Sequence, residues 1–252
     1  MGREIPSPGR MGTRVPSGAR HEGLFRKEPF MVHPCSTAAL FDLTKTQAAP
    51  LLSGTTFPWE ALAGLETFIF QLGESLDPQQ YERLGDYVWA AKTARIAKSA
   101  YLGGPCIIGP GTEVRHGAFI RGSALVGEGC VVGNSVELKN VILFDNVQTP
   151  HYNYVGDSIL GYKSHMGAGS ITSNVKSDKT LVTVKNGAER IETGRKKFGA
   201  ILGDHVEVGC NSVLNPGTVV GRGSSIYPVS CVRGAIPAGS IVKTGGVVVQ
   251  RS

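Results

Sequence analysis

The chain has 252 residues, a net charge of +6 and 34 glycines, and at this length one or two domains are expected. A glycine share well above the usual ~7%, without collagen triplets, predicts turn-rich β structure. The five cysteines include no CxxC pair, which argues against a disulfide framework or a zinc ribbon. With no apolar run near ~18 residues, no secretory signal and no basic patch interleaved with aromatics, we expect a cytoplasmic protein without a membrane or nucleic-acid partner.

The first 88 residues divide into two segments of different composition. Residues 1–30 are rich in Gly, Pro and Arg and lack apolar periodicity, so they are predicted to be a disordered extension. Residues 31–88 contain apolar residues at helical spacing and are predicted to form a small helical cap. We expect this cap to cover an end of the repeat domain that follows, because the first coil would otherwise expose its core.

Two helices are predicted within the cap. Pro58 suits a first helical position, and a helix from about residue 58 to residue 74 would present one apolar face. The apolar residues of that face are Leu62, Leu65, Ile69 and Leu72. A short second helix is expected from Asp77-Pro78 through Leu84.

A period of six residues dominates residues 89–250. Every sixth residue of the first part is large and apolar: Ile96, Leu102, Ile108, Val114, Ile120, Val126, Val132, Leu138 and Phe144. A period of six is neither helical nor simple strand alternation; it predicts a parallel β-helix in which three hexapeptides make one triangular coil of about 18 residues. Cys106 and Cys130 occupy small positions of the repeat and are predicted to be buried packing residues.

The repeat is interrupted twice. It changes at Pro150, and the step from Val155 to Leu160 spans five residues instead of six. An excursion over residues 173–200 then interrupts it, and Asn186-Gly187 within this excursion lies between two strand-like runs. Because Asn-Gly favours a type I′ turn, the excursion is predicted to contain an inserted β-hairpin.

Charged or imidazole side chains follow the large apolar residue where glycine is usual. These exceptions are Arg115, Arg121, Lys139, Asp145 and His151. Side chains 18 residues apart should stack, so Arg121 and Lys139 are predicted to be neighbours, and Arg115 should share a face with His151 two coils away. Stacked cations repel each other unless they bind an anion such as a phosphate; solvated corner charges are the alternative interpretation.

His151 is the candidate general base. It follows Pro150, where the period breaks, and a neutral imidazole can accept a proton from an attacking amine or hydroxyl near neutral pH. The alternative is a purely structural histidine.

From about Ile96 onward the chain resembles the hexapeptide-repeat acyltransferases, a family with a left-handed β-helix. The resemblance is strongest to the acetyltransferase domain of the bifunctional enzyme that joins a UDP-N-acetylglucosamine pyrophosphorylase to a glucosamine-1-phosphate N-acetyltransferase. It is carried by Arg121 and by residues 132–139, 151–157 and 166–174. It implies a homotrimer, acetyl-CoA as acyl donor, no required metal, and an amino sugar phosphate or nucleotide sugar as acceptor. No uridylyltransferase domain is recognisable, so no such activity is expected.

The resemblance also implies roles for single residues. His151 matches the family's general base. The substrate-binding positions are Arg121, Lys139, Tyr154 and His165, the last in place of an asparagine. The positions lining the acetyl-CoA site are Ala168, Asn174 and Cys210, the last in place of a serine.

Two other functions remain open from the sequence. Val175 replaces a tyrosine of the coenzyme site, which favours a non-catalytic module that binds a UDP-sugar or sugar phosphate. His116, His151 and His165 could instead suit a zinc enzyme like the carbonic anhydrases that share this fold. The basic run Arg195-Lys196-Lys197 is predicted to be a solvated loop, with a coenzyme phosphate clamp as the alternative.

Overall fold

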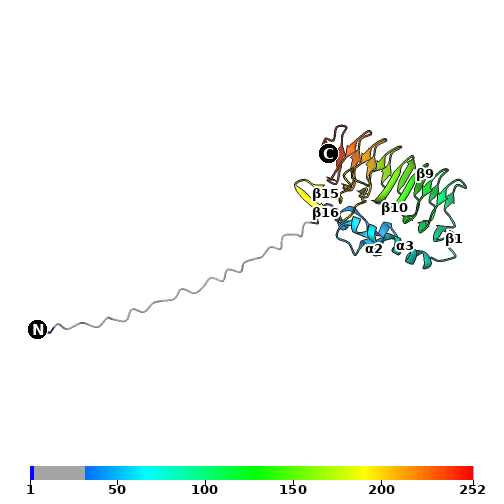
Figure 1. Cartoon of the computed structure of the whole chain (residues 1–252), viewed down its shortest axis with the longest axis horizontal. Helices are drawn as coiled ribbons and strands as arrows, with labels where there is room; N and C mark the ends of the chain where they lie inside the picture. The colour runs from blue at the N-terminus through cyan, green and yellow to red at the C-terminus, as the bar shows by residue number, and fades with distance from the viewer. Residues whose placement is uncertain (3–31, 252) are drawn as a thin grey trace. The chain divides into compact units, whose positions relative to one another are not determined.

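The computed structural model describes residues 1–2 and 32–251. The chain divides into two units, Met1–Met31 and Val32–Ser252, and the second carries the fold shown in Figure 1. The predicted disordered extension over residues 1–30 lies almost entirely outside the described residues. Within the described part, no helix is both long enough and apolar enough to cross a membrane.

A parallel β-helix with three faces forms most of this unit, as the six-residue period predicts. The first face contains β2 (Val88–Ala91), β5 (Cys106–Ile108), β8 (Ala124–Val126), β17 (Ala200–Leu202), β20 (Thr218–Val220) and β23 (Ala235–Ile236). The second contains β3 (Arg95–Ile96), β6 (Glu113–Val114), β9 (Val131–Asn134), β11 (Gln148–His151), β13 (His165–Met166), β18 (Glu207–Val208), β21 (Ser225–Ile226) and β24 (Ser240–Val242). The third contains β4 (Tyr101–Leu102), β7 (Phe119–Ile120), β14 (Ile171–Thr172), β19 (Val213–Leu214) and β22 (Cys231–Val232).

Two longer strands connect the third face to the first. β10 (Glu137–Leu143) and β12 (Tyr154–Leu160) continue through the corner between these faces, so both faces belong to one 14-stranded sheet, while the second face is a separate 9-stranded sheet. Leu138 pairs with Val155, where an 18-residue coil would place Gly156. Each of these coils is therefore one residue shorter than the regular repeat.

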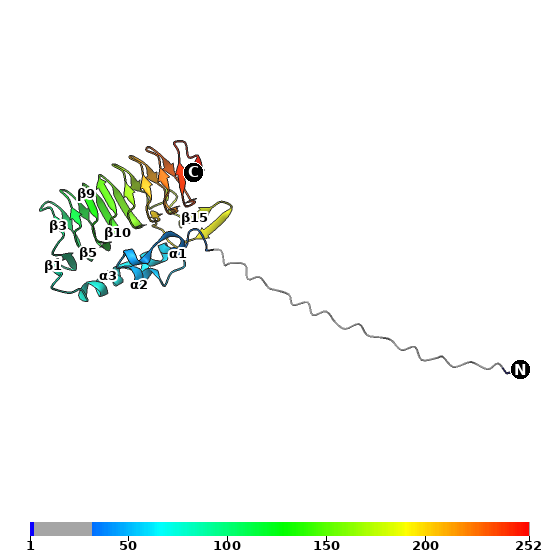
Figure 2. The same cartoon turned by 180° about the vertical axis from the view of Figure 1, so that it is seen from behind.

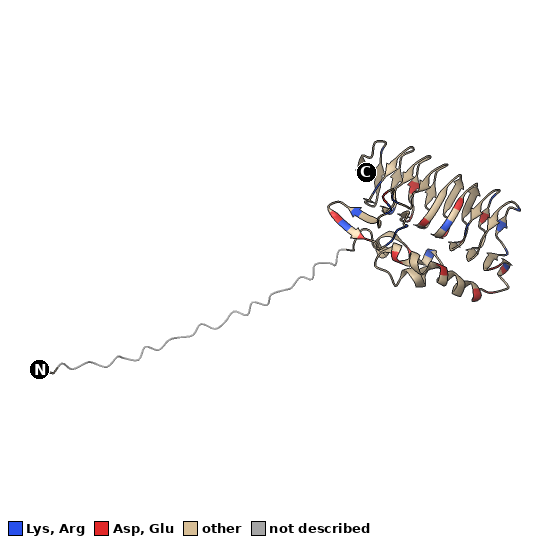
Figure 3. Ribbon diagram, in the orientation of Figure 1, with Lys and Arg blue, Asp and Glu red and all other residues tan. Residues whose placement is uncertain are grey.

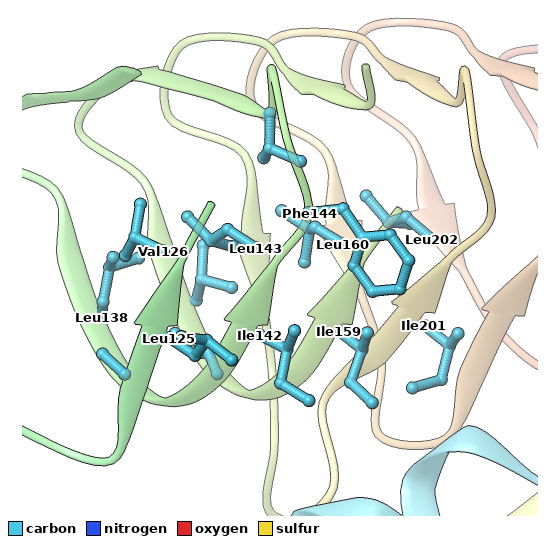
Figure 4. Packing of buried hydrophobic residues seen from close by; sticks show 14 of the residues in the cluster. Leu125, Val126, Leu138, Ile142, Leu143, Phe144, Ile159, Leu160, Ile201 and Leu202 are labelled. Atoms are coloured by element: carbon cyan, nitrogen blue, oxygen red, sulfur yellow. The ribbon is translucent and has the colours of Figure 1, made fainter. Parts of the chain in front are cut away.

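The shortened corner moves the interior position from Phe144 to Leu143. Val126 pairs with Leu143, so the regular period ends one hexapeptide earlier than predicted. Figure 4 shows Leu143, Leu160 and Leu202 stacked in successive coils, with the isoleucines that precede them on the other side of the strands. Phe144 is buried instead against Phe41 of the N-terminal segment, with ring centroids 4.8 Å apart.

The N-terminal helices lie along the first face, and the prediction that they cover an end of the β-helix is wrong. They are α1 (Thr37–Leu40), η1 (Leu43–Lys45), α2 (Ala49–Leu52), η2 (Pro58–Ala63) and α3 (Leu65–Glu74). α3 contacts β5, β8 and β10, and η2 contacts β12, as Figures 1 and 2 show from opposite sides. The reason is a row of outward apolar residues on this face, such as Ile107, Leu125 and Ile142, which the helices bury completely.

Two details of the predicted helices change. The helix expected over residues 58–74 is divided at Gly64 into η2 and α3. The helix expected from Asp77 through Leu84 is wrong, because Asp77 starts a single turn and β1 (Tyr81–Gly85) follows it. β1 pairs antiparallel with β2 and covers the free edge of the first coil. A short helix could not pair with the backbone N–H and C=O groups of that edge.

The excursion contains the predicted hairpin. β15 (Thr183–Asn186) and β16 (Glu189–Glu192) pair antiparallel, and Gly187 in the turn has φ 58°. The excursion leaves the β-helix after β14 and returns at β17, at the same corner that β10 and β12 cross. The last coil is closed by β25 (Val248–Gln250), which pairs antiparallel with β24.

The cysteines predicted to be packing residues are buried. Cys106 and Cys130 are 0% and 1% exposed. Burial raises the pKa of each thiol to about 12, so both remain protonated across the neutral range.

Candidate functional site

A polar cluster lies at the corner between the third and first faces. The Asp157 side chain at its centre is 3% exposed. It accepts hydrogen bonds from Lys139 Nζ at 3.1 Å, Asn140 Nδ2 at 2.8 Å and Asn174 Nδ2 at 2.6 Å. Asn174 Nδ2 also donates to the hydroxyl oxygen of Tyr154 at 3.2 Å. We call these five residues the Asp157 cluster.

The shortened corner explains why these residue types stand here. Asn140 and Asp157 both have left-handed backbone conformations, with φ of 55° and 48°. Asn and Asp tolerate this region better than other side chains that carry a Cβ. Burial, together with the charges of Asp157 and Glu137, raises the pKa of Tyr154. Its phenol is therefore protonated at neutral pH and has a proton to donate to a ligand.

Arg121 lies next to Lys139 in the preceding coil, as predicted. The backbone N–H of Arg121 donates to the carbonyl of Leu138 at 2.9 Å. Each cation, however, has a carboxylate partner: Arg121 Nη1 lies 2.7 Å from Glu137, and Lys139 contacts Asp157. The hydrogen bond to Glu137 raises the pKa of Arg121. The argument that stacked cations require an external anion is therefore wrong, although a guanidinium keeps further donors for one.

His151 ends β11, at the corner between the second and third faces, in a column of residues from successive coils. His151 pairs with Asn134, so Arg115 is not at its level and the predicted Arg115–His151 stack is wrong. The cause is again the coil that is one residue short. The same register places Ala168 and then Cys210 over His151, so the candidate base and two candidate coenzyme residues are adjacent.

The backbone at His151 is held by a buried amide. Asn153 is 2% exposed and accepts a hydrogen bond from the backbone N–H of His151 at 3.2 Å. Its Nδ2 donates to the carbonyls of Gly167 at 2.9 Å and Ser170 at 3.0 Å. The imidazole of His151 itself is exposed, so it is accessible to a ligand.

Within one chain, the candidate substrate residue His165 belongs neither to the Asp157 cluster nor to the His151 column. It pairs with Gln148, at the start of the strand that ends at His151. Its Nδ1 lies 2.9 Å from Glu207, and both residues line a cavity of about 430 Å³ on the second face. Asn174, a candidate coenzyme residue, lies in the Asp157 cluster instead of beside Ala168 and Cys210.

The three histidines nominated for zinc do not converge within one chain. His116 and His151 are separated by two strand spacings, roughly 10 Å, and His165 pairs with Gln148, three residues before His151 on the neighbouring strand. Zinc requires nitrogen ligands within about 2 Å of one ion. Across residues 32–251, no group of three or more His, Cys, Asp or Glu side chains could hold a metal ion.

Sequence reasoning did not identify Asp157, Asn140 or Glu137 as part of a candidate site. A signal for Asp157 was present, because it lies 18 residues after Lys139, the same spacing that links Lys139 to Arg121. Glu137 gave no comparable signal, since it contacts Arg121 across the strands at a different spacing.

Comparison with known proteins is consistent with the hexapeptide repeat. The bifunctional sugar-1-phosphate nucleotidylyltransferase/acetyltransferase of Sulfurisphaera tokodaii is 36% identical over 109 residues, which are 43% of this chain and 27% of that protein. The bifunctional protein GlmU of Methanococcus vannielii is 34% identical over 133 residues, 53% of this chain and 29% of that protein. The chain thus spans less than a third of the length of these two relatives.

Solved structures resemble the chain more distantly. A hexapeptide transferase family protein from Anaplasma phagocytophilum is 18% identical, with a TM-score of 0.38, and the match covers 66% of this chain and 80% of that one. Residues 102–237 match the family described as the GMPPB C-terminal domain, which is more than half of the chain. The protein therefore belongs to the GMPPB C-terminal domain family, a hexapeptide-repeat β-helix family related to GlmU.

Proposed function

We propose that this protein transfers an acetyl group from acetyl-CoA to an amino sugar phosphate or a nucleotide sugar, with His151 as general base. The supporting observation is the arrangement of the third face, which has His151 at one edge and the Asp157 cluster at the other. The five residue steps from His151 to Gly156 span at most about 18 Å. An acceptor on this face could contact the imidazole at one end and, through the long side chains of Lys139 and Arg121, place its phosphate at the other.

The proposed reaction has two steps, attack on the thioester and loss of the thiolate, and His151 transfers one proton in each. The imidazole of His151 takes a proton from the acceptor amine as the amine nitrogen attacks the carbonyl carbon of the thioester. Backbone N–H groups at the glycine-rich corners would stabilise the oxyanion of the tetrahedral intermediate. The C–S bond then breaks, and the protonated imidazole returns its proton to the leaving thiolate. An N-acetyl sugar and free coenzyme A are the products; a hydroxyl acceptor would give the O-acetyl product by the same steps.

The His151 column supports a position for the donor. Ala168 and Cys210 lie directly over His151. A thioester bound beside them would be close to the acceptor amine that the imidazole deprotonates. The acetyltransferase activity in the name of the Sulfurisphaera relative supports acetyl-CoA as that donor. His165 lies three residues before Ala168 in a single chain and contacts Glu207 instead of this column, and a homotrimer with sites between subunits would bring side chains of a second copy to the exposed imidazole.

The test is release of free coenzyme A thiol from acetyl-CoA, measured with amino sugars, their 1-phosphates and UDP-linked amino sugars. His151→Asn should lower turnover by about 10²–10⁴-fold, the usual contribution of a general base. His116→Asn is the matched control, because His116 belongs to the same column two coils away and should leave turnover unchanged. Full activity in His151→Asn would refute the assignment.

The same assay separates the second candidate function, a non-catalytic module that binds a UDP-sugar or sugar phosphate. Val175, at the position of the family's coenzyme tyrosine, is 43% exposed and lines a cavity beside the hairpin, away from the His151 column. Calorimetric binding of UDP-sugar by the wild-type protein without acetyl-CoA binding or thiol release would favour that module.

A further inference from the structure

A cavity of about 540 Å³ opens beside the Asp157 cluster, within the usual size range of small-molecule sites. Lys139 and Asn140 form part of its wall. Residues 62–66 of the N-terminal helices form a second part, and residues 194–197 of the excursion form a third. The cavity therefore exists because the helices and the excursion both extend past the same corner of the β-helix.

The cavity wall carries more positive than negative charge. Its cations are Lys139, Arg195, Lys196 and Lys197, and its carboxylates are Asp157 and Glu66. The Asp157 carboxylate is already engaged by Lys139 and two asparagine side chains, whereas Glu66 is exposed at the rim. Figure 3 shows basic residues in blue on both the excursion and the adjoining coils.

Arg195 is less exposed than the predicted solvated loop implies, whereas Lys196 and Lys197 are exposed as predicted. Arg195 is about half-buried, and the loss of water lowers the pKa of its guanidinium. Its Nε donates to the carbonyl of Lys197 at 3.3 Å, and its terminal nitrogens have no hydrogen-bond partner within residues 32–251. In the same range, Lys196 and Lys197 make no ion pair. Three cations thus border the cavity with donors available.

We propose that Arg195, Lys196 and Lys197 form a subsite for a second phosphate group, next to the phosphate held at Lys139. The acceptor would then be a sugar carrying a diphosphate, that is, a nucleoside diphosphate sugar rather than a sugar 1-phosphate. This inference rests on the proposed binding of the acceptor phosphate at Lys139. Arg121 and Lys139 are enough for one phosphate, whereas the three cations beyond them supply donors for the oxygens of a second phosphate.

The cavity walls also indicate how the nucleoside would be bound. The residues from the helices are Leu62, Ala63 and Glu66, and no aromatic side chain lines the cavity within the described residues. Base stacking on an aromatic ring is therefore absent from this subsite. Recognition would rest on the diphosphate, with the nucleoside packed against the small apolar side chains.

Calorimetry on the full chain tests this subsite without any turnover. The probes are inorganic orthophosphate, inorganic pyrophosphate and UDP. The wild-type protein should bind pyrophosphate and UDP at least about tenfold more tightly than orthophosphate, because hydrogen bonds to charged groups are the strong ones. The double variant Lys196→Ala/Lys197→Ala should lose at least about tenfold in pyrophosphate affinity and little in orthophosphate affinity. Both lysines are exposed, so the variant should fold.

The matched control is Lys176→Ala/Lys185→Ala. These two cations belong to the same excursion but line a different cavity. The control should bind pyrophosphate as the wild type does, which excludes a general charge effect. Unchanged pyrophosphate and UDP binding in Lys196→Ala/Lys197→Ala would overturn the proposal, as would displacement of UDP from the subsite by coenzyme A.

The outcome is distinguishable from a failure of the proposed reaction. His151→Asn leaves the cavity intact and should keep full pyrophosphate affinity, whatever its turnover. Loss of turnover in His151→Asn together with equal pyrophosphate affinity in wild type and Lys196→Ala/Lys197→Ala would retain the reaction and reject the diphosphate subsite. Tight pyrophosphate binding with full turnover in His151→Asn would retain the diphosphate subsite and reject the proposed reaction.

Discussion

Replacing Asp157 with asparagine tests whether one buried carboxylate holds the candidate acceptor site together. The substitution keeps the size of the side chain and tolerates the left-handed backbone at this position. It removes the charge that pairs with Lys139 and turns one acceptor into an amide that faces the donors Asn140 and Asn174. The structure therefore predicts a loss of both stability and acceptor binding.

The expected loss of stability follows from the contacts of Asp157. Each hydrogen bond to a charged group contributes about 1.5–3 kcal/mol, and breaking a buried ion pair typically costs about 3–5 kcal/mol. The Lys139 side chain is 30% exposed, so its ammonium can regain water in the variant. Asparagine also keeps one accepting oxygen. We therefore expect Asp157→Asn to lower the free energy of unfolding by about 3 kcal/mol, near the lower end of that range.

The assay is guanidinium unfolding followed by circular dichroism at a fixed protein concentration, since any oligomer would make stability concentration-dependent. Glu74→Gln is the control, because Glu74 is 63% exposed and its nearest cation, Arg83, lies 3.9 Å away. The control should change stability by less than about 0.5 kcal/mol. In the thiol-release assay, Asp157→Asn should raise KM for the acceptor about tenfold, as Lys139 loses its position. A stability change below about 1 kcal/mol with an unchanged KM would refute the reasoning.

Three further predictions concern buried and exposed groups. Phe144→Ala should lower the free energy of unfolding by about 3–5 kcal/mol, because the ring is fully buried against the N-terminal segment, whereas Phe144→Leu should cost less than half as much; equal effects would contradict that packing. Burial raises the pKa of Cys106 to about 12, so the stability that its protonated thiol contributes is complete below the unfolded-state pKa near 9 and is lost as the pH rises through 12. Between these two values, the free energy of unfolding of the wild type should fall more steeply with pH than that of Cys106→Ala, by about 1.4 kcal/mol per pH unit. An equal slope in the two proteins would oppose this. A thiol reagent should modify Cys210 and Cys231 first, and acetyl-CoA should slow the modification of Cys210 alone; equal protection of both thiols would argue against the proposed donor position.

The scaffold could be predicted from the sequence because the interior of a triangular coil accepts one large apolar residue per hexapeptide. That constraint gives the period, and the structure follows it from Ile96 to Leu138. The position of the helices was missed, although a signal existed. First-face strands such as Cys106–Ile108 and Ala124–Val126 are apolar throughout, which indicates burial on both sides. Strands on the other faces keep a polar or at least partly exposed residue before the interior one.

The candidate site was predicted in part. The assumption that side chains 18 residues apart stack places Arg121 beside Lys139 correctly, because no residue is lost between them. The same assumption fails for Arg115 and His151, because one residue is missing from the corner after Leu138 and every later position shifts. Sequence periodicity alone could not locate this loss, since both Leu143 and Phe144 are large and apolar and either could fill the interior.

The irregularities of the repeat indicate the candidate site better than its missing glycines do. The two five-residue steps, from Leu138 to Leu143 and from Val155 to Leu160, both fall at the corner between the third and first faces. The excursion over residues 173–200 leaves the β-helix at that same corner one coil later. A regular coil is closed and offers no concave surface there. Shortening two corners brings Lys139, Asn140 and Asp157 together, and the excursion then provides the opposite wall, so a cavity forms where the repeat departs from its period.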